Sequence, residues 1–268
     1  MKLLTPVVPD RSAPLGAANP LAKLVAALLL MVALFASLDG VTAGMILVVL
    51  LGLLPVSGVS PGALLGRSWL VLFAAVSVAV INTLLAPAQL GPTLLEAGPI
   101  RIGADTALNG LALGVRLLAI ALAGLLALAT TDPVDLADAL MQHWRVSPRF
   151  ALGALAALRL LPSFAVEWQT IGLARRARGI DAGRSPVAWL RLMGGRLLSL
   201  LVGGVRRATR MAVAMEARGL GSRPCRSAAR PQPMRAADWA WIAGALLLAV
   251  GAVAVSMLIG TWRPLVGG

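Results

Sequence analysis

The stretch ALNGLALGVRLLAIALAGLLALA, residues Ala107 to Ala129, decides the fold class of this chain. A membrane-spanning helix needs about 20 mostly apolar residues, and this stretch supplies them between Asp105 and Thr130. The whole chain agrees, because 59% of its 268 residues are hydrophobic, 13% are charged, and the mean hydropathy is +0.86. Such a composition is typical of membrane proteins.

Four further apolar stretches predict spans, so we expect an all-α membrane protein with about five transmembrane helices. The additional spans are Leu21–Leu38, Val41–Val56, Ser68–Leu85 and Trp239–Ile259. Asn19 and Pro20 form a helix start signal before the first of them. Trp241 and Trp262 lie near the two ends of the last span, where indole rings favour the membrane interface.

The distribution of charge predicts the orientation of the chain in the membrane. Residues 133–235 carry 17 Arg against five acidic residues, part of a net charge of +13. Because Lys and Arg concentrate on cytoplasmic segments, we expect the N-terminus and residues 133–236 to be cytoplasmic. The predicted regions are therefore N-terminal transmembrane helices (about four spans) in residues 1–132, cytoplasmic or interfacial helices in 133–236, and a C-terminal transmembrane helix in 237–268.

Two apolar stretches within the basic region compete as spans. They are Phe150–Val166, which contains Arg159 and Pro162, and Val187–Val205, which contains Arg196. A central Arg costs roughly 2.5–3.5 kcal/mol on insertion scales, so we interpret both as helices along the cytoplasmic face. A seven-span arrangement is the alternative.

Three features inside the helical stretches each have two interpretations. Arg116, in the fourth span, either contacts another helix or a partner subunit within the membrane, or extends its side chain to the interface. The pairs Gly194–Gly195 and Gly203–Gly204 are either flexible joints or close-packing sites. Pro162 is expected to break or kink its helix, either at a functional bend or without a role.

The same helix-ending motif, Ala-Arg-Gly, occurs twice in the basic region. IGLARRARGID (residues 171–181) contains Ala177-Arg178-Gly179, and AVAMEARGLGSRP (residues 212–224) contains Ala217-Arg218-Gly219. Each glycine suits the left-handed residue that follows a helix, and an Arg near the end complements the negative helix terminus. A single copy indicates only a helix cap. Two copies, each with an Arg able to pair with a carboxylate, favour two equivalent grooves on a partner with two similar halves.

These motifs resemble the T component of energy-coupling factor (ECF) transporters, over most of residues 111–223. TTDPVDLADAL (residues 130–140), ALRLLPSF (157–164), ARRARG (174–179) and AMEARG (214–219) carry the resemblance. It implies a prokaryotic plasma-membrane subunit that bridges two ABC-type ATPases to a separate substrate-binding membrane subunit, the S component, for vitamin or metal-ion uptake. It also implies that six residues dock the ATPases: Ala177, Arg178, Gly179, Ala217, Arg218 and Gly219.

The residues also bear on catalysis and cofactors. No G-x-x-x-x-G-K-[ST] motif is present, so we expect ATP and Mg²⁺ to bind the partner ATPases and this chain to hold no cofactor and no catalytic residue. One cysteine (Cys225) and one histidine (His143) disfavour a metal site. Asp132, Asp135 and Asp138 suggest either a cation site or, preferably, carboxylates at a helix N-terminus.

Other classes of protein fit the sequence less well. A CDP-alcohol transferase needs a series of metal-binding aspartates near its Ala-Arg pair, which is absent here. A stand-alone carrier or permease needs polar residues along a midplane path, and Arg116 is the one strong candidate. A nucleic-acid partner is not expected, because the arginines alternate with long apolar runs.

Overall fold

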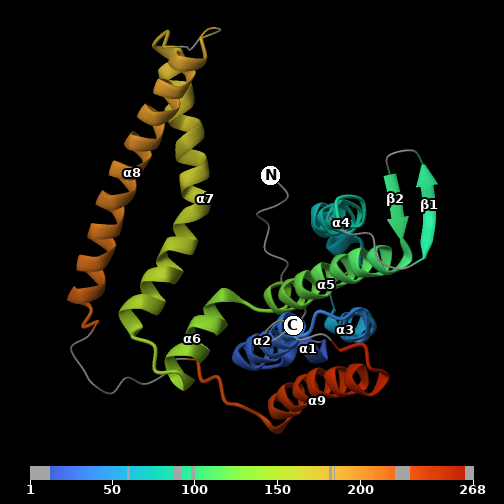
Figure 1. Ribbon diagram of the computed structural model, residues 1–268. Coiled ribbons are helices and arrows are strands. Elements are labelled where there is room, and N and C mark those ends of the chain that lie inside the picture. Colours follow the sequence, from blue (N-terminus) through green and yellow to red (C-terminus); the bar gives the residue numbers. More distant parts are fainter. Residues whose placement is uncertain are drawn as a thin grey trace. The chain divides into compact units, whose positions relative to one another are not determined.

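The computed structural model describes residues 13–58, 61–86, 92–97, 100–180, 183, 185–220 and 230–262 (Figure 1). Lys2, Arg11, Arg184, Cys225 and Arg263 lie outside the described residues. The chain divides into two compact units. Residues 1–139 and 232–268 form the membrane unit, and residues 140–231 form the α7–α8 unit.

The membrane unit contains most of the helices, and its elements come from both ends of the chain. In chain order they are α1 (Pro14–Ala17), α2 (Pro20–Ala36), α3 (Gly40–Leu53), the 3₁₀ turn η2 (Pro55–Ser57), α4 (Pro61–Leu84), β1 (Thr93–Ala97), β2 (Ile100–Gly103), α5 (Ala104–Ala129) and α9 (Ala236–Ile259). Helix α6 (Pro133–His143) begins in this unit and ends in the next.

The five predicted spans are confirmed as helices, which makes the protein an all-α membrane protein. By length and composition, α5, α9 and also α7 (Pro148–Ala177) and α8 (Pro186–Ala217) suit a membrane crossing, whereas α2, α3 and residues 69–84 are shorter apolar helices. At about 1.5 Å per residue, the 14 residues of α3 extend about 21 Å. The choice between five and seven spans therefore stays a prediction.

One element was not predicted from the sequence. Strands β1 and β2 pair as an antiparallel hairpin between α4 and α5, with Leu95 opposite Ile102 and Glu96 opposite Arg101. The strands have five and four residues, too few for an alternating pattern to stand out from the neighbouring apolar helices. The hairpin ends at Gly103, directly before the start of α5.

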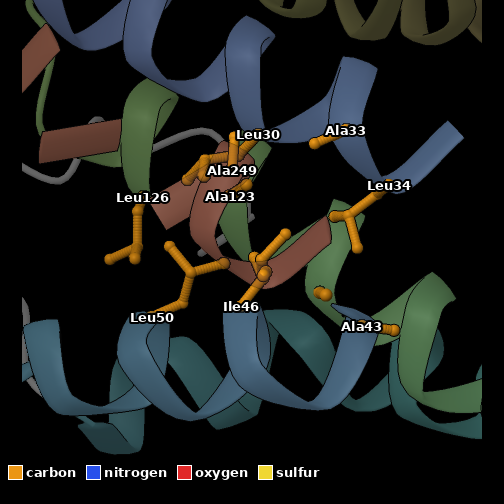
Figure 2. Packing of buried hydrophobic residues seen from close by; sticks show 11 residues of the cluster. Leu30, Ala33, Leu34, Ala43, Ile46, Leu50, Ala123, Leu126 and Ala249 are labelled. Atoms are coloured by element: carbon orange, nitrogen blue, oxygen red, sulfur yellow. The ribbon is translucent and has the colours of Figure 1, made fainter. Parts of the chain in front are cut away.

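The core of the membrane unit lies where α2, α3, α5 and α9 meet. Figure 2 shows side chains from these helices converging on it, among them Leu34 and Ile46, which are almost fully buried. Small residues make up much of the rest, so the helices approach closely. The buried cluster consists of Leu30, Ala33, Leu34, Ala43, Ile46, Leu50, Ala119, Ala123, Leu126, Ala249 and Ala252.

Helix α4 packs against α5 through two glycines one turn apart. A Cβ atom built on Gly110 would lie 2.7 Å from the Ala79 carbonyl oxygen and would also meet the Thr83 hydroxyl. On Gly114 it would lie 3.0 Å from the carbonyl oxygen of Ala75. The pair follows the small-xxx-small pattern of membrane helix contacts, and it fixes α4 directly on the backbone of its neighbour.

The α7–α8 unit consists mainly of two long helices of 30 and 32 residues. Each one joins an apolar stretch and an Ala-Arg-Gly ending in a single continuous helix. Helix α7 runs through Pro162, so of the two outcomes expected there the break does not occur, and the kink stays a prediction. A proline removes one backbone hydrogen bond, and the neighbouring turns hold the helix together.

Candidate functional site

The first Ala-Arg-Gly ending forms a Schellman motif. Arg178 caps α7, and Gly179 has a positive φ of 70°, the left-handed conformation predicted for it. The Gly179 amide donates to the Arg176 carbonyl oxygen at 2.9 Å, and the Ile180 amide donates to that of Arg175 at 3.1 Å. These two bonds satisfy carbonyl groups that a helix end leaves free.

The second ending repeats this geometry bond for bond. Arg218 caps α8, and Gly219 has a φ of 82°. The Gly219 amide donates to the Glu216 carbonyl oxygen at 2.8 Å, and the Leu220 amide donates to that of Met215 at 3.0 Å. The chain therefore builds one backbone shape twice, from two helices with different flanking residues.

The side chains at both tips are accessible. Ala177 and Ala217 are the last residues of their helices and are exposed, as are Arg178 and Arg218. Neither guanidinium group forms a hydrogen bond or an ion pair with another residue in the part of the chain that the structure describes. Each tip thus presents an unpaired cation beyond a small residue.

An ion pair joins the two helices where they pack. Arg207 Nη2 lies 2.9 Å from Glu167 Oε2, while Arg175 Nη1 donates to the Leu192 carbonyl oxygen at 3.1 Å. Late residues of α7 thus meet early residues of α8, so the helices run antiparallel. In Figure 1 they lie close where α7 ends and α8 begins and draw apart away from that end.

The two tips are equidistant from this ion pair. Glu167 precedes Arg178 by eleven residues, and Arg207 precedes Arg218 by eleven residues. At about 1.5 Å per residue, each tip lies about 17 Å along its helix from the pair. Because the helices are antiparallel, the tips point in opposite directions.

Side chains of α7 pack against glycines of α8. A Cβ atom on Gly195 would lie 2.9 Å from Arg175 Nη1, and one on Gly203 would lie 2.9 Å from Glu167 Oε1. The Phe164 ring lies against Gly204 in the same way. Of the two interpretations of the glycine pairs, close packing therefore holds for these three positions, and α8 continues through both pairs without interruption.

Arg116 contacts another helix within the membrane unit. Its Nε donates to the Leu34 carbonyl oxygen at 2.6 Å, in the last turn of α2, where carbonyl groups lack helical partners and the helix dipole favours a cation. Asp39 lies near enough to interact with its charge. Burial would raise the pKa of Asp39, but hydrogen bonds from the Thr42 amide and hydroxyl outweigh it, and the pKa lies below its ordinary value.

Asp132 directly precedes α6, and Asp135 and Asp138 lie within it. Asp132 Oδ1 accepts a hydrogen bond from the Val134 amide at 2.8 Å, the arrangement expected of a carboxylate at a helix N-terminus. Among the described residues, no three His, Cys, Asp or Glu side chains gather as a metal site would need.

A buried lysine, considered in the sequence only for its charge, binds the backbone directly after α5, before α6 leads out of the membrane unit. Lys23, only 6% exposed, donates from Nζ to the Thr130 carbonyl oxygen at 2.7 Å and to that of Gly16 at 3.2 Å. Thr130 follows the last residue of α5. The first turn of α2 is therefore bonded to the exit of the segment that carries α7 and α8.

Asn19, at the start of α2, binds the chain where it re-enters the membrane unit before α9. The Asn19 amide donates to Asp238 Oδ1 at 2.6 Å, and Asn19 Nδ2 donates to the Gln232 carbonyl oxygen at 3.2 Å. Asp238 is 3% exposed and also accepts from the Arg235 amide at 2.8 Å. We call Asn19, Lys23 and Asp238 the anchor, because these residues hold both ends of the inserted segment.

Comparisons with known proteins agree with this architecture. The family model of CbiQ, cobalt transport protein, matches residues 11–225. A protein of Heliobacterium modesticaldum, energy-coupling factor transporter transmembrane protein EcfT, is 29% identical over 93% of this chain and 93% of its own length. EcfT of Exiguobacterium sibiricum is 37% identical over 34% of this chain and 37% of its own length, and EcfT 1 of Listeria monocytogenes is 31% identical over 56% and 58%.

The family match covers most of the chain, including both helix tips up to residue 225. Within the part of the chain that the structure describes, four helices suit a membrane crossing by length and composition. The chain therefore belongs to the CbiQ family of cobalt transport proteins and is a multi-pass prokaryotic membrane protein of the T-component type found in energy-coupling factor transporters.

Proposed function

We propose that this chain couples ATP hydrolysis by two partner ATPases to the movement of a separate substrate-binding membrane subunit, for uptake of a vitamin or a metal ion. The chain itself is not catalytic and binds no cofactor, and ATP and Mg²⁺ bind the ATPases. The tips formed by Ala177–Gly179 and Ala217–Gly219 dock the two ATPases, one tip on each.

The observation that carries the proposal is that the same helix ending occurs twice, on two antiparallel helices whose tips point in opposite directions. Both tips have the same pair of capping hydrogen bonds, the same left-handed glycine and a free guanidinium group. Because each lies about 17 Å from the ion pair along antiparallel helices, they do not enter one groove together. Two equal sites on a paired partner match this arrangement.

Each docking contact rests on the guanidinium group. A planar guanidinium binds a carboxylate through two hydrogen bonds, and the preceding alanine leaves room for a partner to approach. Glycine at the next position ends the helix without a side chain. When ATP closes the two ATPases, their grooves approach each other, and the tips of α7 and α8 move with them. This movement is passed to the membrane unit and reorients the substrate-binding subunit.

The test is reversal of charge at both tips. Truncating one partner of a buried charge pair costs about 2–5 kcal/mol, and a reversal sets like charges together. We expect Arg178→Glu or Arg218→Glu to weaken co-purification with the ATPases and the double variant to abolish assembly and transport. Lysine at both positions should recover part of the binding, because it keeps the charge without the bidentate geometry.

Matched controls are available on the same helices. Arg176 and Arg210 are exposed, and Arg176 points about 200° away from Arg178 because each residue turns a helix by about 100°. Arg176→Glu and Arg210→Glu should assemble and transport like the parent. Normal assembly and uptake by the double tip variant would show that the tips are only helix caps, and would favour a stand-alone carrier.

The cytoplasmic location of the tips has its own test. In a variant with Cys225→Ser, a cysteine introduced at Ser185 should react with an impermeant reagent only after the membrane is opened. Reaction in intact cells would contradict the five-span arrangement, in which residues 133–236 are cytoplasmic.

A further inference from the structure

The membrane unit contains a cavity that the proposed function does not use. It lies between α2, α3, α5 and α9, with Leu15 of α1 at its edge, and has a volume of about 260 Å³. Its walls are almost entirely aliphatic, and the charged residue among them is Lys23. The size approaches that of sites for small molecules, about 300–1,000 Å³.

The cavity has a polar end and an apolar end. Lys23 and Thr130 line one end, and Leu30 and Ala123 line the other, seven residues further along α2 and seven residues back along α5. At about 1.5 Å per residue, the cavity follows the helices for about 10 Å. Leu30, Ala123 and Leu126 line the cavity and also belong to the buried cluster drawn in Figure 2.

Lys23 brings a hydrogen-bond donor to the polar end. An ammonium group has three N–H donors. Among the described residues, two of them have acceptors, the carbonyl oxygens of Gly16 and Thr130. The carboxylates of Asp238 and Asp135 lie near enough to interact with the Lys23 charge, whereas these two hydrogen bonds from Nζ go to carbonyl oxygens. The third N–H is therefore directed to neither carbonyl group, and it favours an oxygen that carries negative charge.

We propose that the cavity binds a phospholipid, with one acyl chain between the four helices and a phosphate oxygen on the Lys23 ammonium group. An empty apolar cavity forgoes the dispersion contacts of its lining. A buried water needs two to four polar partners, which the aliphatic end of the cavity does not provide. Acyl chains surround a membrane protein on all sides. A phospholipid has an apolar acyl chain for the end of the cavity at Leu30 and an anionic phosphate for the end at Lys23.

Gly244 of α9 offers a direct way to fill the cavity. It lines the cavity, and a Cβ atom built on it meets no atom within 4 Å. A leucine at this position therefore enters the space without a clash. Gly251 is the matched control, because it lies two turns further along α9, also has nothing within 4 Å of an added Cβ, and does not line the cavity.

The experiment uses the full chain in vesicles of phosphatidylethanolamine and phosphatidylglycerol, with a phosphatidylglycerol that carries a photoactivatable diazirine at the end of one acyl chain. After illumination, labelled peptides are mapped by mass spectrometry. We expect labelling of Leu30, Leu50 and Leu248, which line the cavity. Gly244→Leu should reduce it about tenfold, since displacing the contacts of a few methylene groups is worth that factor, and Gly251→Leu should leave it unchanged.

The contribution of the phosphate is tested with a second probe. A diacylglycerol with the same diazirine chain lacks the phosphate and should label the cavity less than the phospholipid does. Lys23→Met should lower phospholipid labelling to the level of the diacylglycerol. Size-exclusion profiles and circular dichroism show whether each variant is folded, and Gly244→Leu tests the cavity independently of Lys23.

Three results would overturn the proposal. The first is equal labelling of the Gly244→Leu and Gly251→Leu variants. The second is labelling confined to exposed positions of α9 such as Leu247, which is 73% exposed, because lipid would then contact only the outer surface. The third is loss of cavity labelling when the partner subunits assemble, which would make the occupant a protein segment. The labelling does not involve the ATPases, so it stands or fails separately from the proposed function.

Discussion

The membrane unit and the α7–α8 unit are both built from helices, but different contacts hold them together. In the membrane unit, aliphatic and small side chains from four helices form a buried cluster. Among the described residues of α7 and α8, only Ala151 and Gly172 are buried, and the contacts between the two helices are largely polar. Large apolar side chains such as Val187 and Leu190 are 70% and 68% exposed.

The atoms that face the glycines also differ between the two units. In the membrane unit, Gly110 and Gly114 face backbone atoms of α4, which do not move unless the helix moves. In the α7–α8 unit, Gly172 and Gly195 face the guanidinium groups of arginines, which rotate at little cost. The first unit is therefore a rigid frame, and the second is a pair of helices whose contact tolerates adjustment. The proposed movement of the two tips with their ATPases would require that tolerance.

The largest expected effect comes from adding one methyl group to the rigid frame. In Gly110→Ala, the new Cβ would lie 2.7 Å from the Ala79 carbonyl oxygen, so α4 and α5 must separate. Overpacking costs about 1–3 kcal/mol, and we expect the upper part of that range, because backbone atoms meet the methyl group. Thermal unfolding of the purified protein in detergent measures the loss.

The control for this prediction is Gly44→Ala in α3, where an added Cβ meets no atom within 4 Å. Alanine is favoured over glycine in a helix by about 1 kcal/mol, so this variant should be as stable as the parent or more stable. An unchanged unfolding temperature in Gly110→Ala would contradict the close α4–α5 contact and the rigid frame.

A smaller effect is expected at the anchor. Lys23→Met keeps most of the side-chain volume but leaves the Thr130 carbonyl oxygen, bonded at 2.7 Å in the parent, without its donor. An unsatisfied buried acceptor costs about 1 kcal/mol or more. We also expect ATPase binding to persist while transport falls, because the inserted segment is no longer held where it leaves the frame. Uptake reduced in proportion to ATPase binding would show that the residue only stabilises the fold.

Much of this architecture could be predicted because each feature depends on residues close together in the sequence. A span follows from a run such as Ala107–Ala129, and the left-handed Gly179 and Gly219 follow from their position after a helix. The fold class, the family and both helix ends were therefore accessible. The role of the tips in docking depends on a partner and stays a prediction.

The features that were missed depend on residues far apart in the chain. The anchor joins Lys23 to Thr130 and Asn19 to Asp238, 107 and 219 positions apart, and no local pattern reports such a contact. At Pro162 a local signal was misleading. Proline tends to end a helix, but the turns on either side outweigh this preference and α7 continues.

The ion pair between the two helices should have a moderate effect. Arg207 and Glu167 are partly exposed, at 35% and 28%, and such pairs contribute about 0.2–1 kcal/mol. Glu167→Arg should therefore change the distance between spin labels at the two tips more than it changes stability. The exchanged pair, Glu167→Arg with Arg207→Glu, should restore the parent distance distribution. If the exchanged pair behaves like the single variant, the ion pair does not set the geometry of the tips.

The smallest effect is expected when a glycine of the α7–α8 unit is replaced by alanine. In Gly195→Ala, the new Cβ would lie 2.9 Å from Arg175 Nη1, nearly as close as a Cβ on Gly110 would lie to the Ala79 carbonyl oxygen. Here the neighbour is the end of a flexible side chain. Its hydrogen bonds to Leu192 at 3.1 Å and to Ser199 at 3.4 Å are partly buried and exposed, respectively. The gain in helix preference, up to about 1 kcal/mol, offsets their loss, so we expect stability within about 0.5 kcal/mol of the parent. Unfolding of this variant measured beside Gly110→Ala tests the comparison directly: equal losses would mean that α7 and α8 are packed as rigidly as the frame.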